Sequence, residues 1–224
     1  MKTRQSGFTL VEIAIVLVII GLLLGGVLKG QELITQAKIK NVANDFNGLT
    51  SAIYSYQDRY KRLPGDDPGA GRWTFTGGGG GAVPAGNGDN VVGGTYESTN
   101  NANESRLFWA HLRLAGFIGG AADTLANAAS QPLNAAGGII GVQAGGMGLA
   151  GTIICSGSLP AKIAQAIDNQ FDDGDARTGN VRGELDSSPP TAVALPAGTP
   201  PVSAAPANNY QDNGTNLYVI CKNI

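Results

Sequence analysis

The sequence predicts an α+β protein in which one long N-terminal helix packs on a small antiparallel sheet with additional short helices. Three observations lead to this prediction. Residues 8–28 form an apolar run that a single charge interrupts. Residues 31–60 contain no proline, and their apolar residues recur at helical spacing. Two β-rich stretches, 151–155 and 216–221, each end in one of the two cysteines.

The run from Phe8 to Leu28 is long enough to cross a membrane. Its roughly 21 residues would make a helix about 31 Å long, which matches the hydrocarbon core of a bilayer. Glu12 is the only charge in the run, and a carboxylate at such a position is costly, which marks it as functional. Lys2 and Arg4 precede the run, so the positive-inside rule places the N-terminus in the cytoplasm.

The residues ahead of this run are arranged differently from those of a secretory signal. There, cleavage follows the apolar segment at small residues, whereas here Ser6 and Gly7 precede it. The stretch from Gly7 to Glu12 reads GFTLVE and resembles the type IV prepilin signature of type IV pilins and type II secretion pseudopilins. The resemblance implies a pilin fold, cleavage by a prepilin peptidase between Gly7 and Phe8, and N-methylation of Phe8. It also implies that Glu12 serves filament assembly; the alternative is a plain signal anchor with a stray glutamate.

Physical chemistry supports that role for Glu12. A carboxylate in lipid must be protonated or must find a cation. Cleavage would create an amine on Phe8, and four residues along a helix span about 6 Å. The contact could form within one chain or between neighbours. Between neighbours, it would make burial of the charge depend on correct stacking.

The helix should continue beyond the membrane as an amphipathic segment over residues 29–62. The apolar stripe expected to contact the globular domain consists of Leu33, Ala37, Val42, Phe46, Leu49, Ile53, Tyr56 and Tyr60. Within the membrane run, Gly21, Gly25 and Gly26 weaken the helix and would allow close packing or local melting. Many major pilins carry a proline where this chain has Lys29, a departure that favours a minor or pilin-like subunit.

We expect residues 1–7 to form a leader peptide and residues 63–224 to form an extracytoplasmic globular domain. Its first residues, LPGDDP, should end the helix because Pro64 excludes Leu63 from helical geometry. The glycine-rich residues 69–103 are predicted to be a mobile surface loop unless neighbouring subunits order them.

Two shorter helices are expected within this domain. One begins near residue 104 and stops at Gly116, and its pattern ESxxFWxHLxxAGxI resembles the second helix of pilin-like proteins. The other is predicted over residues 159–171 with Ser158 as its N-cap. Residues 119–151 are left without an assignment, and the proline-rich residues 186–209 are predicted to be an extended linker or loop.

An acidic turn follows the second of these helices. Asp168, Asp172, Asp173 and Asp175 lie at its C-terminal end, where negative charge opposes the helix dipole. A calcium ion would relieve this repulsion, and some pseudopilins hold calcium in a loop. The spacing does not match an EF-hand, and the favoured alternative is a turn held by side-chain hydrogen bonds and by Arg177 or Arg182. No cofactor other than this structural calcium is indicated.

Cys155 and Cys221 are predicted to form a disulfide. They are the only cysteines, both end strand-like segments, and both should face an oxidising compartment. The alternative is a pair of separate buried thiols.

The sequence shows no catalytic constellation. His111 is the only histidine and has no serine or cysteine partner in a motif, so a structural role is favoured over a general base. The formal net charge of −2 and the evenly mixed charges show no nucleic-acid-binding patch.

These observations predict a structural subunit of a type IV pilus-like filament, a minor or pilin-like one. Its expected partners are other pilin or pseudopilin subunits, prepilin peptidase and an inner-membrane assembly platform. We expect a single pass through the inner membrane with the globular domain in the periplasm before assembly. A type II secretion pseudopilin is the first alternative, and a tip adhesin or DNA-uptake pilin is the second.

Overall fold

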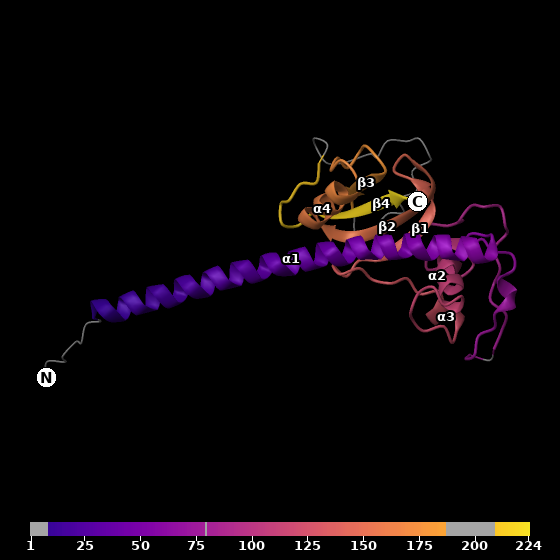
Figure 1. The fold of residues 1–224 in the computed structure, drawn as a ribbon, viewed down its shortest axis with the longest axis horizontal. Coiled ribbons are helices and arrows are strands. Elements are labelled where there is room, and N and C mark those ends of the chain that lie inside the picture. The colour runs from indigo at the N-terminus through magenta and orange to yellow at the C-terminus, as the bar shows by residue number, and fades with distance from the viewer. Residues whose placement is uncertain (1–8, 79, 187–208) are drawn as a thin grey trace. The chain divides into compact units, whose positions relative to one another are not determined.

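The computed structural model of the chain describes residues 9–78, 80–186 and 209–224. The chain divides into two compact units, Met1–Lys38 and Ile39–Ile224. Its elements in order are α1 (Leu10–Tyr60), the 3₁₀ helix η1 (Ala70–Arg72), α2 (Glu104–Leu114), α3 (Leu125–Ala128), β1 (Ile140–Gly146), β2 (Leu149–Pro160), α4 (Ala161–Phe171), β3 (Val181–Leu185) and β4 (Leu217–Asn223). Figure 1 shows a long N-terminal helix, a four-stranded sheet and short helices, which confirms the predicted α+β fold class.

The first part of α1 is apolar and lies uncovered. An 18-residue window of this helix has a mean hydropathy of 2.8, and none of the window is buried within the chain. Leu10 and Leu28 are 87% and 67% exposed. By length and composition, this helix can cross a membrane.

The second part of α1 supplies the central stripe of the core. Its buried residues are Val42, Ala43, Phe46, Leu49, Ala52, Ile53 and Tyr56. They match the predicted stripe from Val42 to Tyr56, and Tyr60 lies partly buried beside them. Leu33, which was also expected on this stripe, is 60% exposed. The stripe therefore starts later along the helix than the periodicity indicated.

The sheet is antiparallel throughout, with strand order β1-β2-β4-β3. The C-terminal strand β4 thus lies inside the sheet, between β2 and β3. On the sheet's inner face, α4 packs against the second part of α1, where the rings of Phe46 and Phe171 meet edge to face at 5.9 Å. In Figure 1 the sheet and α4 lie on one side of this part of α1, and α2 and α3 lie on the other.

The predicted disulfide is confirmed. Cys155 on β2 and Cys221 on β4 are directly paired in the sheet, and their sulfur atoms are bonded. Both cysteines are fully buried, in a small cluster on the sheet that includes Tyr96 and Ile153. The bond therefore fastens the C-terminal strand to the centre of the sheet.

One local prediction needs correction, and another is confirmed. The helix after β2 begins at Ala161 with Pro160 as its N-cap, so Ser158 is not the cap. Ser158 instead sits at a bulge in β2 with φ of 54°, where its backbone N–H and its hydroxyl both donate to Asp186. Gly116 ends α2 with φ of 79°, as expected of a helix C-terminus.

Residues 119–151, which the sequence left unassigned, contain α3, β1 and the start of β2. The proline-rich segment predicted over 186–209 falls almost entirely on residues 187–208, which lie outside the described part of the chain.

Candidate functional site

The start of α1 holds Glu12 in a capping box. Thr9 precedes the first helical residue, and its backbone N–H and hydroxyl donate to Glu12 Oε2 at 2.8 and 2.7 Å. In return, the Glu12 backbone N–H donates to Thr9 Oγ1 at 3.3 Å. This reciprocal pattern satisfies backbone donors that the first helical turn leaves free. Sequence reasoning missed it, although the Thr-x-x-Glu spacing was its signal.

The capping box fixes the Glu12 carboxylate at the very beginning of an apolar surface. Val11 and Ile13, on either side of Glu12, are 65% and 49% exposed. A charged group and large apolar side chains thus share one uncovered segment. Such a surface is stable only against lipid or against other apolar helices. Gly7 and Phe8, the predicted cleavage and methylation residues, lie outside the described part of the chain.

Comparison with protein families decides what this segment is. Residues 2–28 match the prokaryotic N-terminal methylation motif. The chain carries the type IV prepilin signature. This signature is shared by type IV pilins and pseudopilins, so it implies processing by prepilin peptidase and assembly with other pilin subunits. It points to a structural protein rather than an enzyme. No curated protein and no solved structure matched the chain significantly.

The LPGDDP motif joins the end of α1 to the rest of the second compact unit. The buried Asp67 carboxylate accepts hydrogen bonds from the Tyr56 hydroxyl, the Gly69 N–H and Arg72 Nη1, each at 2.7 Å. Burial tends to raise the pKa of this carboxyl, but the hydrogen bonds from Arg72 and Tyr56 outweigh it and lower the pKa. Asp67 therefore stays ionised and holds the turn against the helix.

The second aspartate of the motif orders the glycine-rich segment. Asp66 is fully buried, and its two oxygens accept from the backbone N–H groups of Gly88, Asp89 and Asn90. Glu104, at the start of α2, accepts from two further backbone N–H groups of the same segment. The prediction that residues 69–103 form a mobile surface loop is therefore wrong, since these carboxylates bind their backbone. The segment also buries four side chains of its own, those of Phe75, Val83, Val92 and Tyr96.

His111 connects the same turn to α2 and is a structural histidine. Its Nδ1 accepts the N–H of Gly65 at 2.9 Å, and its Nε2 lies 3.0 Å from the Pro84 carbonyl oxygen, which can only accept. Both ring nitrogens are thus engaged, and the neutral Nε2–H form is required. Gly65 has φ of 87°, and a Cβ there would meet the Glu104 carbonyl oxygen at 2.4 Å, so only glycine fits.

This geometry predicts a pH effect on stability. Burial lowers the pKa of His111 below its usual 6.5. The stability that neutral His111 contributes is therefore complete above pH 6.5 and is lost as the pH falls further, by about 1.4 kcal/mol per pH unit until the folded pKa is reached. The His111→Gln variant keeps an acceptor and a donor but does not titrate. We expect the difference in unfolding free energy between wild type and His111→Gln to shrink from pH 7.5 to pH 5, as measured by urea unfolding. A constant difference would contradict the assignment.

The acidic turn after α4 brings three of its four predicted carboxylates together. Oxygen atoms of Asp168, Asp172 and Asp173 lie within 4.8 Å of one another, whereas Asp175 is not part of this group. Asp168 is buried and accepts from the Tyr210 hydroxyl at 2.7 Å and from the Gly174 N–H at 3.1 Å. Burial raises the pKa of Asp168 to about 6.

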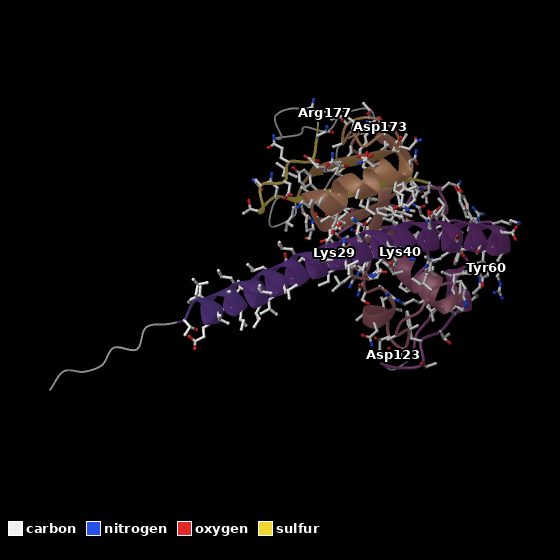
Figure 2. The ribbon with its side chains drawn as sticks, turned by 60° about the vertical axis from the view of Figure 1, so that its left-hand side comes forward. Lys29, Lys40, Tyr60, Asp123, Asp173 and Arg177 are labelled. Carbon is white, nitrogen blue, oxygen red and sulfur yellow. A yellow bond between two sulfur atoms is a disulfide. The ribbon has the colours of Figure 1, made fainter. Side chains whose placement is uncertain are left out.

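Hydrogen bonds within the turn engage the remaining carboxylates. Asp172 accepts the backbone N–H groups of Asn180 and Val181, and Asp173 accepts from the Thr178 hydroxyl at 2.6 Å. Arg177 and Arg182, which were expected to hold this turn, form no ion pair with these carboxylates within the described residues. Arg182 donates instead to backbone carbonyls, and the Nε of Arg177 is buried without a partner there. Figure 2 labels Asp173 and Arg177 in this turn.

Proposed function

We propose that the chain is a structural subunit of a type IV pilus-like filament, and specifically a minor or pilin-like subunit. One observation carries the proposal: a prepilin signature leads into a helix whose apolar first part the chain itself leaves uncovered. Lipid can cover that surface before assembly, and the equivalent helices of neighbouring subunits can cover it afterwards. The second compact unit has its own core, so it can remain folded in both states.

The proposed route begins with a chain that crosses the inner membrane once, with residues 1–7 in the cytoplasm and the globular domain in the periplasm. Prepilin peptidase removes the leader after Gly7, and the amine of Phe8 is methylated. An inner-membrane assembly platform then moves the subunit into the filament. Residues 8–28 form the filament core, residues 29–62 continue the helix, and residues 63–224 face outward.

Intact-mass spectrometry of protein purified from the native membrane tests the first step. We expect the mature chain to begin at Phe8 and to carry one N-terminal methyl group. A Gly7→Leu variant serves as the control, because it should keep the leader and show no methylation. A wild-type mass that includes residues 1–7 would overturn the proposal.

A type II secretion pseudopilin is the first alternative, since the signature is common to both kinds of subunit. Deletion of the gene separates the two. A pilus subunit affects surface filaments, whereas a pseudopilin affects the release of secreted proteins. A tip adhesin or DNA-uptake pilin is a further alternative, and DNA-binding measurements on assembled filaments would detect the latter.

For cofactors, we propose that the acidic turn folds without a metal ion, because hydrogen-bond donors within the turn already engage the carboxylates of Asp168, Asp172 and Asp173. Occupancy of a calcium site at 100 times its Kd would stabilise the fold by about 2.7 kcal/mol. We expect the unfolding free energy to be the same in excess calcium and in excess chelator. A calcium-dependent gain that Asp173→Asn abolishes would instead establish calcium at this turn.

A further inference from the structure

A pocket of about 240 Å³ opens on the second compact unit, beside the glycine in the middle of α1. Asp45, Gly48 and Leu49 of α1 line it on one side, and Trp109 and Arg113 of α2 line it on the other. We call it the Gly48 pocket. Its volume is below that of typical small-molecule sites and is close to that of one large side chain. The pocket therefore suits a side chain of a docking protein.

Three polar groups in the walls of the Gly48 pocket have unused bonding capacity. Asp45 is partly buried and forms no hydrogen bond or ion pair within the described residues, and burial raises its pKa. Trp109 is fully buried, and its Nε1–H has no acceptor there. Arg113 donates through Nε and Nη1 to backbone carbonyls, but in the described part of the chain its Nη2 donates to none. Two of these groups, the Asp45 carboxylate and the Arg113 Nη2, are thus free to bond a docking group, whereas the Trp109 N–H is buried out of its reach.

Neither backbone geometry nor packing against the described residues requires a glycine at position 48. It lies inside a helix, where glycine costs about 1 kcal/mol relative to alanine. Its φ is not in the left-handed region, and a Cβ built there would meet no atom within 4 Å. The backbone and the space within the chain would therefore accept alanine. A glycine at this point would allow another molecule to approach the helix backbone closely.

A segment of α1 itself matches the pocket in charge and spacing. Lys29 and Glu32 are exposed and form an ion pair at 2.7 Å, and Leu33 beside them is 60% exposed. Figure 2 labels Lys29 on this part of α1. Lys29 and Leu33 are four residues apart, as are Asp45 and Leu49 of the pocket. Residues four apart share one helix face, so the cation could meet the carboxylate while the two leucines meet each other.

We propose that the Gly48 pocket receives the Lys29–Leu33 segment of a second copy of the chain. Lys29 then pairs with Asp45, and Glu32 accepts from the free Nη2 of Arg113. The exposed ion pair that is given up is worth about 1 kcal/mol or less, so exchanging its partners costs little. The pocket and the segment are different surfaces, so the contact is head-to-tail. Each added copy leaves one pocket and one segment free, and the contact can therefore propagate into an open filament. This inference rests on the proposed function.

Cysteine cross-linking in filaments of the full chain tests the contact. The described residues contain no free cysteine, so any new cross-link must come from the introduced thiols. Mild oxidation of the Leu33→Cys/Gly48→Cys variant should give a ladder of covalent multimers. The matched control is Leu33→Cys/Tyr54→Cys, because Tyr54 is 55% exposed on α1 but does not line the pocket. It should give no ladder.

Charge exchange provides a second measurement. The Asp45→Lys variant should lower incorporation into filaments by about tenfold, because two cations then face each other. Adding Lys29→Glu to the same chain restores an opposite-charge pair and should recover most of the incorporation. A mere folding defect in Asp45→Lys would not be rescued by a change at Lys29.

The outcomes separate this inference from the proposed function. Wild-type chain that inserts into the membrane but never enters a filament overturns both. Filaments that contain the chain but give no ladder, or equal ladders for both cysteine pairs, overturn only the contact with a second copy. The contact with a second copy is also overturned if Gly48→Cys cross-links exclusively to a different kind of subunit.

Discussion

Replacing Glu12 by alanine should leave the chain in the membrane and remove most of it from filaments. Insertion becomes easier because a carboxylate inside a bilayer costs up to about 3 kcal/mol. In the assembly proposed above, Glu12 pairs with the amine of a processed Phe8 and so sets register between subunits, and the variant would lose this contact. We expect incorporation to fall by at least about tenfold, a loss of about 1.4 kcal/mol per subunit contact. The measurement compares the chain in sheared filaments with the chain in the membrane fraction.

The capping box supplies a control for this result. Thr9→Val removes the hydroxyl that bonds Glu12 but keeps the carboxylate. Losing such a cap costs about 1 kcal/mol of helix stability, so a purely local role for Glu12 predicts similar defects in both variants. We expect Thr9→Val to assemble far better than Glu12→Ala. Normal incorporation of Glu12→Ala would refute the assembly role.

Local patterns in the sequence were sufficient to predict the core face of α1 and the disulfide-linked strands. The buried face of α1 from Val42 to Tyr56 follows from apolar residues that recur about every 3.6 positions, a period that helices have and strands do not. The two strands that carry Cys155 and Cys221 follow from their β-branched and apolar residues, although β2 runs on to Pro160, beyond the predicted end at Cys155. The expectation of an oxidising compartment led to the prediction of their bond. Each of these signals lies within a few residues of the feature that it predicts.

Features that depend on distant partners were beyond the sequence. Composition makes residues 69–103 look mobile, but the buried Asp66 binds three of their backbone N–H groups from more than twenty positions away. Ser158 has the composition of a helix cap, but the bulge in β2 brings it to Asp186 instead. Neither pairing has a fixed spacing, since each is set by tertiary packing rather than by neighbours along the chain.

Removing both cysteines should be the most destabilising of the changes considered outside the membrane. The bond closes a loop with a sequence separation of 66. In the chain-entropy model, such a loop stabilises the fold by about 4 kcal/mol, a large part of the 5–15 kcal/mol typical of a domain. The Cys155→Ala/Cys221→Ala variant should therefore lose about 4 kcal/mol of unfolding free energy in urea. Alanine is used because a serine hydroxyl would be buried there without an assured partner.

The position of β4 explains why this loss would spread. Among the described residues, β3 pairs with β4 alone and β4 reaches β1 through β2, so the bond sits on the connection between the two halves of the sheet. Without it, backbone hydrogen bonds and packing alone hold β3 and β4 to the rest. Hydrogen exchange should then show increased opening of β3 and β4, while α2 keeps most of its protection. A double variant with wild-type unfolding free energy, or oxidised native protein in which both cysteines can be alkylated, would contradict this role.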